Sequence, residues 1–121
     1  MIMTFGDRSG LEGKSREWIK GMIDFMRTID VELAASGELV FQQGLADASE
    51  AKTVQMRDGA PATSGGPLLE SNPLAGFWVV DVRDEARAIE IAAQISQAAD
   101  AAIEVRQCMD APPDDVLELI G

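Results

Sequence analysis

The sequence predicts one α+β domain of the ferredoxin-like class, with an antiparallel sheet in βαββαβ order and two helices on one face of the sheet. Two long segments carry apolar residues at helical spacing, and strand-like segments precede, separate and follow them. The chain has 121 residues, enough for one domain, and 46% of them are apolar, which excludes disorder over most of its length.

The first third of the chain predicts a strand, a loop and a long helix. Residues 2–6 alternate weakly and end at a glycine, as a short strand would, and residues 8–14 form a polar, Gly-rich loop. Ser15 is a suitable N-cap for a helix over residues 15–36, and Gly37 is a typical stop signal. The expected buried stripe of this helix contains Ile19, Met22, Met26, Ile29 and Leu33.

The middle of the chain predicts a series of strands joined by turns. Strand patterns occupy residues 38–43, 52–57, 60–63 and 75–82. The Asp58-Gly59 pair between the second and third of these is typical of a tight hairpin. The last of the four is apolar at both alternating positions, a pattern typical of a strand that is covered on both faces.

The last third predicts a second helix, a final strand and an acidic tail. Asp84 is a suitable N-cap for a helix over residues 84–99, and a strand is expected over 103–108. We therefore divide the chain into a domain over residues 1–109 and an acidic tail over 110–121. The expected buried stripe of the second helix contains Ala88, Ile89, Ala92, Ile95 and Ala99, with Ile91 beside it. One apolar helical turn in the tail is expected to contain Val116, Leu117, Leu119 and Ile120.

The second face of the sheet needs a cover that two helices cannot provide. In the most apolar strand, Phe77 and Val79 point to one side. Trp78, Val80 and Val82 point to the other side. A second copy of the chain is the simplest cover, so we expect a homodimer with an α+β barrel-like architecture in which this strand is central.

Charge and composition exclude several function classes. Lys and Arg number 10 against 21 Asp and Glu, and the net charge of −11 argues against nucleic-acid binding. The chain has no His, the commonest general base and metal ligand. Its one Cys allows neither a disulfide framework nor a Cys-rich zinc site, and fits a reducing compartment.

The expected location follows from the absence of targeting signals in the sequence. The apolar stretch at the N-terminus is too short for a signal peptide and lacks a basic start. No segment approaches the ~20 apolar residues of a membrane span. We therefore expect a soluble cytoplasmic protein with no metal, no cofactor, and neither nucleic acid nor membrane as a partner.

Six blocks of sequence occur in the order of a known family. They are 32–40 (ELAASGELV), 44–46 (GLA), 52–59 (KTVQMRDG), 76–82 (GFWVVDV), 88–92 (AIEIA) and 103–107 (IEVRQ). Over residues 1–109 the chain thereby resembles the YCII-related proteins of the DGPF type. The Asp-Gly-Pro-Phe motif of that family is degenerate here, because Gly65-Gly66-Pro67-Leu68 keeps only its Gly and Pro.

The resemblance implies a ferredoxin-like domain that dimerises through its sheets, often with a cleft at the interface. Some YCII relatives resemble enzymes that use a His-Asp pair, and one branch acts in the degradation of chlorinated aromatics. Others are encoded beside, or fused to, extracytoplasmic-function sigma factors. Because this chain has no His, the His-Asp pair cannot be transferred to it.

Five residues are candidates for a functional site. Glu70 follows the Gly-Pro turn at a family position, and Asp81 alternates with apolar strand residues, so either carboxylate could act as an acid or base. The alternatives are a solvated loop residue and a strand-end residue that helps to cap the next helix. Arg57 and Arg106 could bind an anion, and Trp78 could stack on a planar ligand. Ion pairs within the chain and core packing are the alternatives for these three.

Three functions remain open from the sequence. The leading one is a non-catalytic YCII-like dimer that binds a small molecule or a protein. The second is an enzyme that uses carboxylate acid-base chemistry in a dimer-interface cleft without His. The third is a regulatory partner of a sigma factor, which rests only on the resemblance.

Overall fold

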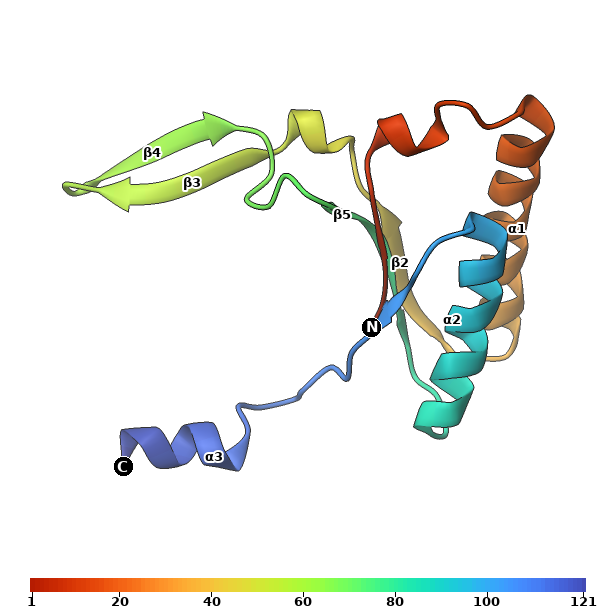
Figure 1. The fold of residues 1–121 in the computed structure, drawn as a ribbon. Coiled ribbons are helices and arrows are strands. Elements are labelled where there is room, and N and C mark those ends of the chain that lie inside the picture. The colour runs from red at the N-terminus through yellow and green to blue at the C-terminus, as the bar shows by residue number, and fades with distance from the viewer.

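The computed structural model describes residues 1–121, and in it two helices cover one face of a four-stranded antiparallel sheet (Figure 1). The strands are β1 (Ile2–Phe5), β2 (Leu39–Gly44), β3 (Lys52–Arg57), β4 (Ala60–Gly65), β5 (Leu74–Val80) and β6 (Glu104–Val105). The α-helices are α1 (Arg16–Ala35), α2 (Glu85–Ala99) and α3 (Asp114–Leu117). Three short 3-10 helices are η1 (Arg8–Leu11), η2 (Ala48–Glu50) and η3 (Glu118–Ile120). The predicted α+β class with antiparallel strands is confirmed.

The order of strands in the main sheet is β2-β5-β1-β6, which is compatible with the ferredoxin-like arrangement. All three neighbouring pairs are antiparallel, and Ile2 lies opposite both Trp78 and Val105. β3 and β4 form a separate two-stranded hairpin. β5 is therefore an inner strand of the main sheet, flanked by β2 and β1.

Both long helices begin at the residues that their sequence signals predict. The side chain of Ser15 accepts a hydrogen bond from the N–H of Trp18 at 3.0 Å, and that of Asp84 accepts from the N–H of Arg87 at 2.9 Å. Each bond satisfies one of the free N–H groups of a first helical turn. α1 ends before Gly37, which has a φ of 77° that glycine adopts without strain.

The core lies between the two helices and one face of the sheet. Its buried residues are Ile2 and Trp78 of the sheet, Ile29 and Leu33 of α1, and Ile91, Ala92 and Ile95 of α2. The predicted stripe of α2 needs one correction, because Ile91 is fully buried whereas Ile89 is 54% exposed. The contact with the sheet is centred on the turn that holds Ile91 and Ile95, and this rotates Ile89 towards solvent.

The register of β5 decides which of its side chains face the helices. Val80 lies opposite Leu39, and both pack against the core, on the same side as Trp78. Phe77 and Val79 therefore point to the other face, because successive side chains of a strand alternate. No element of the chain forms a layer over that face (Figure 1), where the rings of Phe41 and Phe77 lie 6.0 Å apart between centroids.

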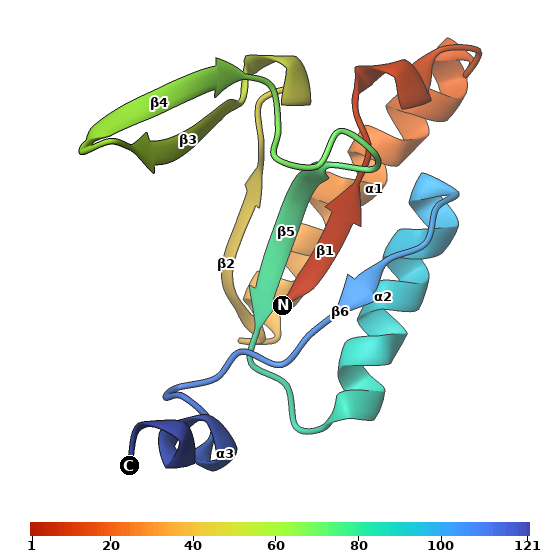
Figure 2. The same cartoon turned by 60° about the vertical axis from the view of Figure 1, so that its left-hand side comes forward.

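Two parts of the chain extend from the sheet on the side opposite the helices. They are the β3–β4 hairpin and the tail that contains α3 (Figures 1 and 2).

β6 is shorter than the expected strand over residues 103–108, because its partner β1 pairs with it only at Ile2 and Met3. The N–H of Arg106 donates to the carbonyl of Met1, and beyond it no strand is left to pair with. None of the helices is long and apolar enough to cross a membrane.

Candidate functional site

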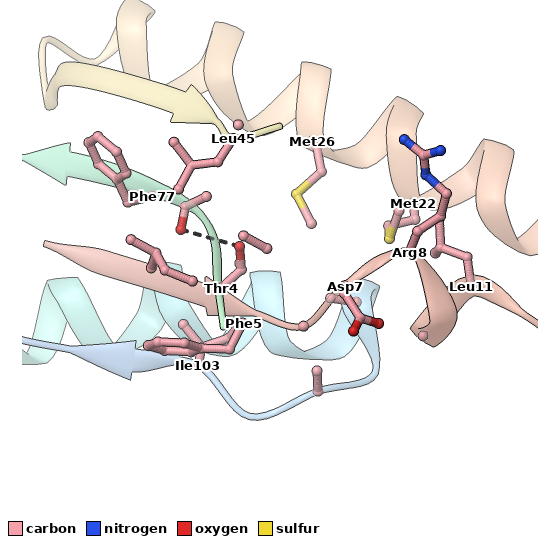
Figure 3. Close-up of a pocket in the computed structure, with 18 of the residues that line it drawn as sticks. Thr4, Phe5, Asp7, Arg8, Leu11, Met22, Met26, Leu45, Phe77 and Ile103 are labelled. Atoms are coloured by element: carbon pink, nitrogen blue, oxygen red, sulfur yellow. Dashed lines mark hydrogen bonds between the residues drawn. The ribbon is translucent and has the colours of Figure 1, made fainter. Parts of the chain in front are cut away.

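A cavity of about 860 Å³ opens between the first part of α1 and the sheet, at the end where β1 finishes and β5 begins. Met22 and Met26 reach from α1 towards Thr4 of β1 (Figure 3). Trp18 also lines the cavity, one turn before Met22. Ile29 and Leu33 are the buried residues of α1, whereas Phe25 and Met26 pack against the core but are only partly buried.

Glycines in the sheet leave room for this cavity. Gly76 of β5 lies opposite both Gly44 of β2 and Thr4 of β1, and all three line the cavity. A Cβ atom at Gly76 would lie 3.1 Å from the carbonyl oxygen of Gln43, so any other residue here would require β2 to move away by a few tenths of an ångström. The hydroxyl of Thr4 donates to the Gly76 carbonyl at 3.3 Å. Because Gly44 and Gly76 lie side by side on adjacent strands and have no side chains, the sheet cannot fill the space between these glycines and the two methionines of α1.

Asp30 and Trp78 form a polar contact within the cavity wall. The indole N–H of Trp78 donates to Oδ1 of Asp30 at 2.7 Å, and both residues line the cavity. Trp78 is buried and Asp30 is half-buried on α1. No other group of the protein is hydrogen-bonded to the Asp30 carboxylate, so its Oδ2 has a free acceptor.

Hydrogen bonds between three connecting segments hold the mouth of the cavity. Asp47, between β2 and β3, accepts from the N–H of Arg8 at 2.9 Å and from the N–H of Ser49 at 3.2 Å. The hydroxyl of Ser49, followed by these N–H groups, lowers the pKa of Asp47 to about 2. Lys14 lies 3.5 Å from Asp100 at the end of α2 and 4.5 Å from the ring centre of Trp18. The polar groups of this rim are thus largely paired with one another.

Of the five site residues expected from the sequence, the structure places Trp78 in the cavity and the other four outside it. Glu70 is exposed in the β4–β5 connection, and Arg57 is exposed at the end of β3. Asp81 is exposed after β5, where its N–H donates to the carbonyl of Glu38. Asp81 is on the same face of the sheet as Phe77 and Val79, the face that the chain itself leaves uncovered, and the N-cap of α2 is Asp84 and not Asp81. Arg106 lies 3.8 Å from Glu104, the ion pair within the chain that was its alternative.

Sequence reasoning missed all the charged residues that line the cavity, and among them Asp30 is the one bonded to Trp78. A signal was available, because Asp30 follows Met26 by four residues and therefore lies on the same face of α1. The glycine pair had no such signal, since Gly44 and Gly76 meet only through the pairing of β2 with β5.

Comparison with protein families finds that residues 5–112 match the model of the YCII-related domain. The matched segment contains the main sheet from Phe5 onward, the two long helices, the hairpin and every residue of the cavity except Thr4. A comparison with curated proteins found no match.

Proposed function

We propose that this chain, which belongs to the YCII-related domain family, is a dimeric domain that binds a small molecule in the cavity between α1 and the sheet. The cavity itself carries this proposal. Its volume of about 860 Å³ lies within the roughly 300–1,000 Å³ of pockets that hold small molecules. Fifteen of its 29 lining residues are apolar, and the polar ones include Asp30 and the charged residues of the rim, so the cavity combines apolar walls with groups that can orient a ligand.

The exposed surface of the chain supports the dimer. The single chain exposes 8928 Å². A compact monomer of its mass, 13.0 kDa, is expected to expose only about 6,300 Å². The excess of roughly 2,600 Å² is comparable with what each partner buries in a large obligate interface. The open sheet face, the hairpin and the tail account for this excess, and all three lie on the same side of the sheet (Figure 1).

The β3–β4 hairpin and the tail also need external support. An isolated two-stranded hairpin is marginally stable in water, and so is a helix of a single turn. Val54 and Met56 of the hairpin are 60% and 62% exposed, and Leu119 and Ile120 of the tail are 83% and 84% exposed. Most homo-oligomers are two-fold symmetric, so the same face of each chain meets its partner. A second copy that packs on the open sheet face would therefore contact both the hairpin and the tail.

A binding role is favoured over catalysis because the cavity contains neither a His nor a nucleophile paired with a base. The enzyme alternative has one specific observation in its favour, the half-buried Asp30 carboxylate with a free oxygen. In that alternative Asp30 takes the acid-base role that Glu70 and Asp81 were expected to hold. Turnover of a bound compound, lost in Asp30→Asn with the fold intact, would establish it.

Binding is tested with N-phenyl-1-naphthylamine, a neutral fluorescent probe of apolar sites. We expect saturable binding of one probe per chain, weakened by Met26→Trp, which places a bulkier side chain in the cavity. Met56→Trp is the matched control, because Met56 lies on the exposed hairpin outside the cavity. Circular dichroism verifies the fold, and Met22→Trp provides a second way to fill the same space.

The outcome that contradicts the proposal is a probe affinity that neither Met26→Trp nor Met22→Trp changes, or no saturable binding at all. In either case the cavity is not a binding site for apolar small molecules, and a protein partner becomes the better hypothesis.

A further inference from the structure

We propose that the cavity selects ligands in which a protonated amine is attached to an apolar, planar body, with Asp30 as the counter-ion of the amine. This inference rests on the proposed small-molecule function and specifies the chemical class of its ligand.

The first argument is the geometry of Asp30. Its Oδ1 accepts the indole N–H of Trp78 at 2.7 Å, which fixes the carboxylate in the wall of the cavity. Its Oδ2 has no partner in the protein, and no cation of the protein lies within 4 Å of the carboxylate. A half-buried carboxylate is most strongly stabilised by a cation, because removing a charge from water is costly unless the charge is both paired and hydrogen-bonded.

The second argument is the balance of charge around the cavity. Four carboxylates and two cations line it. One of the cations, Lys14, is already paired with Asp100 and lies over the ring of Trp18. The other, Arg8, is exposed in η1. In a chain of net charge −11, this arrangement gives the cavity a negative potential that concentrates cations.

The third argument concerns the body of the ligand. Met22 and Met26 extend into the cavity from one side (Figure 3). Thioether sulfurs are polarizable and make favourable contacts with aromatic rings, and methionine side chains adapt to the shape of what they contact. Met22 and Met26, which precede Asp30 on the same face of α1 and line the same cavity, thus favour a flat, apolar group attached to the amine.

Three matched ligands test the charge preference: naphthalene that carries an aminomethyl, a hydroxymethyl or a carboxylate group. Each is titrated at pH 7 against N-phenyl-1-naphthylamine bound to the protein. We expect the amine to bind at least about tenfold more tightly than the alcohol, and the carboxylate to bind most weakly. Asp30→Asn should remove the advantage of the amine and leave the affinity of the alcohol within about threefold, because the amide oxygen still accepts from Trp78.

Asp24→Asn is the matched control for charge. Asp24 lies on the same helix, is exposed and pairs with Lys20 outside the cavity. If Asp24→Asn and Asp30→Asn weaken amine binding equally, the preference is a general effect of the acidic surface and the role of Asp30 is refuted. Equal affinity for amine and alcohol, or tighter binding of the carboxylate through Arg8, also overturns the inference. In those cases the binding function still stands, whereas failure of all three ligands and of the probe contradicts the function itself.

Discussion

The indole N–H of Trp78 bonds to Oδ1 of Asp30 at 2.7 Å and thereby joins inner strand β5 to helix α1. The bond lies where the tight packing of α1 gives way to the cavity. It therefore has two consequences, one for the stability of the helix–sheet contact and one for the orientation of the carboxylate.

Removal of the Asp30 carboxylate should lower the free energy of unfolding. Asp30→Ala leaves the N–H of buried Trp78 without a partner, and we expect a loss of about 1–3 kcal/mol in the free energy of unfolding. Asp30→Asn keeps an oxygen acceptor and should cost much less. Urea denaturation, followed by Trp fluorescence, measures both. Equal losses in the two variants would mean that the hydrogen bond contributes little.

Two adjacent valines should separate dimerisation from folding. Val79 faces the open side of the sheet, whereas Val80 packs against the core. We expect wild-type protein to sediment at twice 13.0 kDa. Val79→Asp should raise the dimer Kd at least about thirtyfold with the fold retained, as loss of an interface hot spot does.

Val80→Asp is the contrasting variant. It places an unpaired charge against the core and should prevent folding. The register of β5 therefore predicts opposite effects for the two adjacent valines, on folding at Val80 and on dimerisation at Val79. A wild-type protein that sediments as a monomer at micromolar concentration would refute the dimer itself.

Deletion of residues 111–121 tests the role of the tail. The apolar turn of the tail extends away from its own domain (Figure 2), and an apolar side chain that becomes buried contributes about 1.5–3 kcal/mol. If the tail packs on a partner subunit, the truncated protein should have a lower Tm and a weaker dimer. An unchanged Tm and an unchanged dimer Kd would identify the tail as an unattached acidic extension.

The ion pair of Glu38 and Arg87 should make stability depend on pH in acid. Both carboxylate oxygens of Glu38 accept from Arg87 at 2.9 Å, which joins the start of β2 to α2. The two bonds from Arg87, together with one from the hydroxyl of Ser36, lower the pKa of Glu38 from 4.5 to about 2. The bonds to Glu38 also raise the pKa of Arg87. Ionised Glu38 thus stabilises the fold fully above pH 4.5, and this contribution is lost as the pH falls through 2.

The matching experiment compares wild type with Glu38→Gln by denaturant titration at several pH values. The wild type should be more stable at pH 6, and the difference should shrink between pH 4.5 and pH 2. A difference that stays constant over this range would show that the pair does not stabilise the fold through its charge.

The sequence by itself determined the order and the approximate bounds of the elements. Helical spacing and the capping residues Ser15 and Asp84 act within a few neighbours along the chain, so the signals are complete before any tertiary contact exists. The same holds for the Asp58-Gly59 turn, at which Asp58 has a φ of 50° and Gly59 one of 81°.

Only the tertiary structure decided where the candidate site lies. Met22 and Met26 have the same spacing as the buried Ile29 and Leu33, yet they line a cavity, because the part of the sheet below them carries glycines on adjacent strands. Periodicity shows which face of a helix turns inward, but the volume that meets this face depends on strand register.

Tertiary structure also decides the two polar contacts that join distant parts of the chain. Asp30 meets Trp78, and Glu38 meets Arg87, across nearly fifty residues of sequence. Side chains so far apart come together only when β5 lies between β1 and β2 and both helices pack on one face. No local pattern encodes that juxtaposition. The carboxylates that the sequence offers as candidates, Glu70 and Asp81, lie outside the cavity, whereas the half-buried carboxylate that lines it belongs to α1.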